Sequence, residues 1–165
     1  MPGCGKSTVG RPLAARLGVP FVDPDRLIEA QHGRPLGEVS AAAGSRDAFL
    51  RIEEAANLAV PAVSSVVAPG GSVIYCDTAM RRFRTFARVV WLDVPAEELE
   101  NRLGDLTARA VVIAPGMTLA DLAAERRPLL ERWSDARVAA GGKAVEEVVQ
   151  EIAALCGAGV PPAHR

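Results

Sequence analysis

The chain has 165 residues, with 19 lysines and arginines against 20 aspartates and glutamates, and this length suits one compact domain. Its near-neutral charge offers no broad basic surface, so we expect neither nucleic acid nor acidic lipid as a partner. Three widely spaced cysteines form no metal or disulfide pattern. The most apolar stretch (55–75) is interrupted by prolines, serines and glycines, and the N-terminus is unlike a signal peptide. Together these features predict a cytoplasmic protein.

Hydrophobic periodicity and turn residues predict helices and strands that alternate along the chain. In chain order they are a helix at 6–17, a strand at 21–22, helices at 25–31 and 36–60 (broken at 44–45), a strand at 64–68, a helix at 78–86, a strand at 88–94, helices at 95–103 and 118–130, a strand at 137–139 and a helix at 143–156. Thr118 and Asp121 resemble a capping box, while 104–117 shows little periodicity.

This alternation predicts a three-layer α/β fold, in which a parallel sheet is flanked by helices and binds ligands at the carboxyl ends of its strands. We expect one domain over 1–156 and a disordered tail at 157–165.

The sequence Gly3-Cys4-Gly5-Lys6-Ser7-Thr8 matches the end of the phosphate-binding pattern GxxxxGK[ST]. Its glycines allow backbone N–H groups to surround phosphate oxygens, Lys6 reaches the β- and γ-phosphates, and Ser7 binds Mg²⁺. Because a helix follows at once, we interpret the segment as a nucleotide-binding P-loop with ATP and Mg²⁺ as cofactors.

The first glycine of the pattern would fall one position before Met1, and the strand that normally leads into the loop is missing from this chain. In the predicted sheet that strand is central, between the strands at 21–22 and 64–68 on one side and the strand at 88–94 on the other. We therefore expect an apolar strand encoded upstream of Met1, whose addition raises stability and ATP affinity.

Two carboxylates, Asp23 and Asp25, follow the strand at 21–22. In phosphoryl transfer one carboxylate orders Mg²⁺ and another receives the acceptor hydroxyl, so we assign Asp23 to the metal and Asp25 to catalysis. The alternative is structural, with Asp25 capping the next helix.

The segment GKSTVGRPLAARLGVPFVDPD, followed by LIEAQHGRPLGEV, is similar to the N-terminal signature of shikimate kinases. The glycine loop Pro69-Gly70-Gly71-Ser72 and the segment Glu125-Arg126-Arg127-Pro128-Leu129 also match that family. The resemblance implies transfer of the γ-phosphate of ATP to shikimate, giving shikimate 3-phosphate for aromatic amino-acid biosynthesis by way of chorismate, in a monomer.

The resemblance also implies roles for individual residues. Asp25, Gly70, Gly71, Ser72 and Arg126 would bind the substrate, Arg126 through the substrate carboxylate. Lys6, Asp25 and Arg109 would be catalytic, Arg109 from a lid over the transferring phosphate. Arg102 would lie against the adenine.

Two departures concern the acceptor: Leu50 stands where the family has a second carboxylate-binding arginine, and Ser72 replaces a third glycine. The neighbouring Arg51 should point about 100° away on a helix. Alternatives therefore remain open: a kinase for another sugar acid or polyol such as gluconate, or a catalytically idle nucleotide-binding domain.

Overall fold

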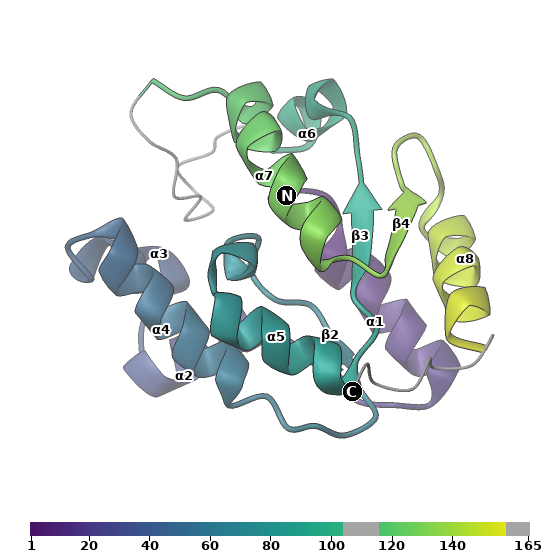
Figure 1. Cartoon of the computed structure of the whole chain (residues 1–165), viewed down its shortest axis with the longest axis horizontal. Helices are drawn as coiled ribbons and strands as arrows, with labels where there is room; N and C mark the ends of the chain where they lie inside the picture. Colours follow the sequence, from purple (N-terminus) through teal and green to yellow (C-terminus); the bar gives the residue numbers. More distant parts are fainter. Residues whose placement is uncertain (104–115, 158–165) are drawn as a thin grey trace.

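The computed structural model describes residues 1–103 and 116–157 (Figure 1). In chain order its elements are α1 (Lys6–Leu17), β1 (Phe21–Val22), α2 (Pro24–His32), α3 (Leu36–Ala42), α4 (Arg46–Leu58), β2 (Val66–Val67), the 3-10 turn η1 (Val73–Tyr75), α5 (Asp77–Phe86), β3 (Val90–Asp93), α6 (Ala96–Leu103), α7 (Leu119–Trp133), β4 (Ala136–Ala139) and α8 (Val145–Gly157).

The observed elements confirm the predicted alternation, with differences mainly at their ends. The helical region at 36–60 is divided into α3 and α4 at Gly44, whose φ of 75° suits glycine. The capping box of Thr118 and Asp121 is present at the start of α7. This helix continues beyond the predicted end at residue 130 because Trp133 is buried and its indole nitrogen donates to the carbonyl of Ile74 at 3.1 Å.

All four strands of the described residues pair in parallel, but in two separate sheets. β1 pairs with β2, with Phe21 opposite Val66, and β3 pairs with β4, with Trp91 opposite Arg137. The predicted parallel α/β fold is confirmed. Within 1–103 and 116–157 no strand lies between β2 and β3, and β2 is shorter than the predicted strand at 64–68.

An apolar cavity of about 590 Å³ lies between the two sheets. Its walls include Val66 and Val67 of β2, Val90 and Leu92 of β3, and Val9 of α1. The inner edges of β2 and β3 thus border the same cavity, at the position that the sequence predicts for the central strand.

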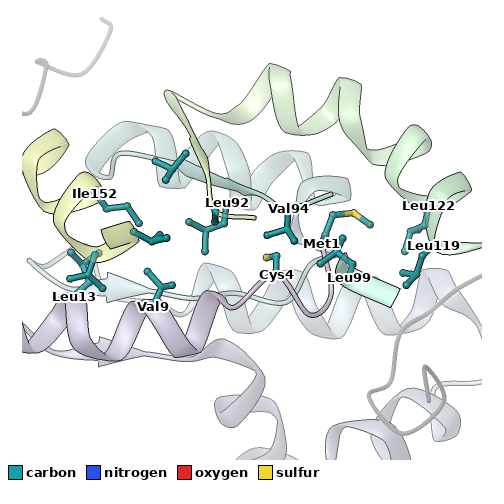
Figure 2. Packing of buried hydrophobic residues seen from close by; sticks show 14 residues of the cluster. Met1, Cys4, Val9, Leu13, Leu92, Val94, Leu99, Leu119, Leu122 and Ile152 are labelled. Atoms are coloured by element: carbon teal, nitrogen blue, oxygen red, sulfur yellow. The ribbon is translucent and has the colours of Figure 1, made fainter. Parts of the chain in front are cut away.

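The largest apolar cluster packs α1 and α8 against β3 and β4 and continues to α6 and α7. In Figure 2, Val9 and Leu13 of α1 lie on the side of Ile152, while Cys4 and Met1 lie near Val94 and Leu99. A second cluster joins η1, α5 and α7, and a third joins α2, α3 and α4, which gather away from β3 and β4 (Figure 1). The first cluster holds the residues before α1 in place.

The segments that follow β1, β2 and β3 lie at the same edge of the structure, where the strands end. Asp23 follows β1, Pro69 and the glycine turn follow β2 after Ala68, and Val94 follows β3. This is the edge at which open α/β sheets bind ligands.

No helix in the described part of the chain is long and apolar enough to cross a membrane. Gly157, expected to begin the tail, is the last residue of α8, and residues 158–165 lie outside the described residues.

Candidate active site

The loop before α1 turns through two glycines with left-handed backbone angles. Gly3 has φ of 71° and Gly5, the N-cap of α1, has φ of 92°, a region that other residues rarely adopt. Gly5 has no side chain to cap the helix, so among the described residues the N–H groups of its first turn, which contains Ser7 and Thr8, remain available to an anion. The backbone angles of Gly3 and Gly5 are thus ones that the glycines of the predicted phosphate loop allow.

Lys6 folds back along this loop, where its Nζ donates to the carbonyl of Met1 at 3.0 Å and lies 3.9 Å from Cys4 Sγ. Burial raises the pKa of the Cys4 thiol, but the charges of Lys6 and the Met1 amino group outweigh burial, so that pKa lies below its ordinary value. Lys6 thus places a positive charge at the loop, as phosphate binding requires.

Asp23, and not Asp25, caps α2. Asp23 Oδ1 accepts from the backbone N–H of Asp25 at 3.2 Å, so the alternative assignment of Asp25 as the cap is wrong. Burial, and then the charge of Asp23, raise the pKa of Asp25 to about 6. A carboxylate with this pKa is a better proton acceptor near neutral pH than an ordinary aspartate.

The glycine turn after β2 approaches three charged side chains so closely that a Cβ there would press on their terminal atoms. A Cβ on Gly70 would lie 2.8 Å from Glu53 Oε1 and 3.0 Å from Asp25 Oδ1, and one on Gly71 would lie 2.8 Å from Arg126 Nη1. The structure therefore brings together Asp25, the predicted glycines and Arg126, and adds Glu53 to them.

Ser72, the residue after these glycines, binds Glu53. Its Oγ donates to Glu53 Oε1 at 2.6 Å, while the buried Oε2 has no partner among the described residues. Glu53 is only 3% exposed, and burial, with a contribution from Asp25, raises its pKa to about 7 against the opposing effects of Ser72 and Arg126.

Arg126 reaches this turn from α7 and is also only 3% exposed. Its Nε donates to Tyr75 Oη at 3.3 Å, and Tyr75 Oη donates to Glu125 Oε1 at 2.5 Å. Arg126 has no ion pair with a described residue. A buried guanidinium without a carboxylate partner is costly, and a ligand carboxylate would supply that partner.

The remaining predicted residues lie on α6 and beyond it. Arg102 Nη1 lies 3.9 Å from the Cβ position of Gly5, next to the phosphate loop, and Arg102 forms an ion pair with Glu98. Arg109 lies outside the described residues.

Within 1–103 and 116–157 no group of three or more histidines, cysteines, aspartates or glutamates could hold a metal. Mg²⁺ does not need such a group, because it is commonly held by one or two side chains together with nucleotide phosphates. Ser7, in the first turn of α1, and Asp23, which uses Oδ1 for its cap, are oxygen ligands of the type that fits this ion.

Sequence reasoning missed Glu53 and Tyr75. The sequence could have indicated Glu53, because this residue ends the segment Phe49-Leu50-Arg51-Ile52-Glu53, where the family also has a glutamate. The sequence offers no such indication for Tyr75, because this residue lies in a 3-10 turn that the hydrophobic pattern does not predict.

Comparisons with known proteins show the family of this chain. The family model for shikimate kinase matches residues 2–156. A shikimate kinase of Symbiobacterium thermophilum is 36% identical over 154 residues, which are 91% of this chain and 88% of the relative. One from Mycobacterium avium is 38% identical over 141 residues, covering 84% and 79%.

Solved structures give the same result. The structure described as shikimate kinase from Acinetobacter baumannii in complex with shikimate has a TM-score of 0.84 and 26% identity, over 94% of this chain and 88% of that one. The fold is also that of shikimate kinase from Aquifex aeolicus, with a TM-score of 0.77 and 24% identity over 96% and 92% of the two chains. The phosphate loop, the glycine turn with its buried arginine and these matches over most of the sequence show that the chain belongs to the shikimate kinase family.

Proposed function

We propose that this chain transfers the γ-phosphate of ATP to a hydroxyl of shikimate and forms shikimate 3-phosphate. One observation carries the proposal: the edge that holds the phosphate loop also holds a buried arginine, Arg126, and the carboxyl groups of Asp25 and Glu53, which meet at Gly70 and Gly71. A basic group for a carboxylate and acidic groups for hydroxyls suit a hydroxylated acid.

In this proposal the protein acts by positioning and charge. Lys6 and the N–H groups of the loop bind the β- and γ-phosphates, while Ser7 and Asp23 hold Mg²⁺, which neutralises phosphate charge when bound. The oxygen of the acceptor hydroxyl attacks the γ-phosphorus while the bond from that phosphorus to the leaving ADP oxygen breaks. Asp25 accepts the proton that the hydroxyl loses. Arg126 binds the acceptor carboxylate.

The two arginines of α6 and the segment after it complete the proposal. Arg102, next to the phosphate loop, lies against the base of the nucleotide. Arg109, by the family resemblance, covers the transferring phosphate.

A kinase acting on another sugar acid or polyol such as gluconate is the second candidate, and the surroundings of Leu50 favour a polyol. Leu50 packs against the apolar cluster of η1 and α5, so position 50 supplies no charge to the acceptor. A site with one fewer guanidinium at this position binds any carboxylate less tightly, which disfavours shikimate relative to an uncharged polyol.

An assay of ADP release with Mg²⁺, ATP and either shikimate or gluconate tests both candidates. We expect turnover with shikimate, and a fall in kcat of at least about a hundredfold in Asp25→Asn with the KM for ATP unchanged. Turnover of gluconate alone would select the second candidate, and no turnover with any acceptor would favour the idle nucleotide-binding domain. We also expect a monomer in sedimentation and a cytoplasmic location.

A further inference from the structure

One face of α4 is directed toward the acceptor site. Arg46, Leu50, Glu53 and Asn57 follow one another at intervals of four, three and four residues, a spacing that places them on the same side of a helix. Glu53 lies at the glycine turn, and Leu50 packs in the cluster that also contains Tyr75. Arg46 therefore lies one helical turn before Leu50 on this face.

Arg46 and Arg126 meet at the same aromatic ring although they come from different helices. The Cζ of Arg46 lies 4.5 Å from the centroid of Tyr75, and the Cζ of Arg126 lies 5.4 Å from it. Tyr75 is bound at its hydroxyl by Arg126 and Glu125. The ring thus holds a second guanidinium beside the one proposed to bind the acceptor carboxylate.

The present partner of Arg46 is easily exchanged. Arg46 Nη2 lies 3.3 Å from Glu125 Oε1, and the two side chains are 41% and 34% exposed. Ion pairs this exposed contribute little to stability, and Glu125 keeps its hydrogen bond from Tyr75 if Arg46 turns to another anion.

We propose that Arg46 is the second carboxylate-binding guanidinium of the acceptor site, in place of the arginine that family resemblance assigns to position 50. The inference rests on the proposed function and deepens it, since it specifies a hydroxylated acid whose carboxylate is bound by guanidinium groups from α4 and α7.

Steady-state kinetics of Arg46→Ala, Arg46→Lys and Arg51→Ala test this assignment. Arg46→Ala is expected to raise the KM for shikimate about tenfold, with kcat and the KM for ATP within about twofold of wild type. Arg46→Lys keeps the positive charge but lacks the planar guanidinium, so its KM for shikimate should lie between those of wild type and Arg46→Ala. Arg51 lies on the same helix, is exposed and is the matched control, with the kinetics of wild type expected.

The methyl ester of shikimate, which lacks the negative charge, separates carboxylate binding from a structural role. Wild type and Arg46→Ala should have similar KM values for the ester. If wild type is active and Arg46→Ala has an unchanged KM for shikimate, the inference is overturned and the proposed function is left intact. The same holds if Arg46→Ala raises the KM for the ester as much as the KM for shikimate. If wild type does not phosphorylate shikimate, the proposed function fails and the inference fails with it.

Discussion

Replacing Glu53 with glutamine should change how the stability of this protein depends on pH. Glu53 is 3% exposed, and its pKa is raised from 4.5 to about 7, chiefly by burial. The folded protein therefore favours the protonated carboxyl, while the unfolded chain loses the proton near its ordinary pKa. Stability from this group is fully present below pH 4.5 and is lost as the pH rises to about 7.

The magnitude follows from the size of the shift. Each pKa unit corresponds to about 1.4 kcal/mol, so the free energy of unfolding should fall by roughly 2–3 kcal/mol between pH 5 and pH 8 because of Glu53. Glutamine mimics the protonated carboxyl, since its amide oxygen can accept from Ser72 Oγ as Oε1 does. Glu53→Gln should lack this fall and be more stable than wild type at pH 8.

Urea denaturation followed by circular dichroism at pH 5, 6, 7 and 8 measures this difference. Burial also raises the pKa of Asp25 and lowers that of the Met1 amino group, with opposite effects on stability, but both groups are present in wild type and in the variant. Glu97→Gln, on the exposed surface of α6, is the control, and its free energy of unfolding should change with pH as that of wild type does. If Glu53→Gln also runs parallel to wild type, the reasoning is refuted.

Three further predictions concern the phosphate loop, the core and the cavity. Lys6→Ala should abolish Mg·ATP binding in calorimetry, because the loop loses its positive charge, and retained binding would contradict the assignment of the P-loop. Leu122→Ala, at a side chain 1% exposed, should lower the free energy of unfolding by about 2–5 kcal/mol in denaturant titration, and a loss below about 1 kcal/mol would show that the core closes around the gap. A short apolar strand and a glycine added before Met1 should raise the melting temperature, because the edges of β2 and β3 gain hydrogen-bond partners across the cavity of about 590 Å³. A Gly-Ser extension of equal length is its control, and equal melting temperatures would argue against a strand in the cavity.

Local patterns were sufficient for most of the fold and for half of the site. The phosphate loop is one continuous segment, so Gly3 to Thr8 could be assigned from their order alone, and the glycine conformations agree with that assignment. The bounds of β1 were also predictable, because the apolar pair Phe21-Val22 is followed directly by Asp23, whereas β2 and β3 are shorter than predicted. The family resemblance added Arg126, whose place in the fold the local sequence does not reveal.

Contacts between distant segments were not predictable in this way. The hydrogen bond from Ser72 to Glu53 joins residues 19 positions apart, and the hydroxyl of Tyr75 accepts from Arg126 across 51 positions. Local sequence suggested only Asp25 as a cap of α2, whereas Asp23 is the cap in the structure.

The sequence by itself determined the parallel α/β arrangement and the phosphate loop, because both depend on residues that are close together in the chain. Only the tertiary structure decided that Glu53, Asp25 and Arg126 meet at two glycines and that Arg46 reaches Tyr75. Burial and charge at that meeting point set the pKa values of the acids, and these depend on how whole helices pack, which no single segment encodes.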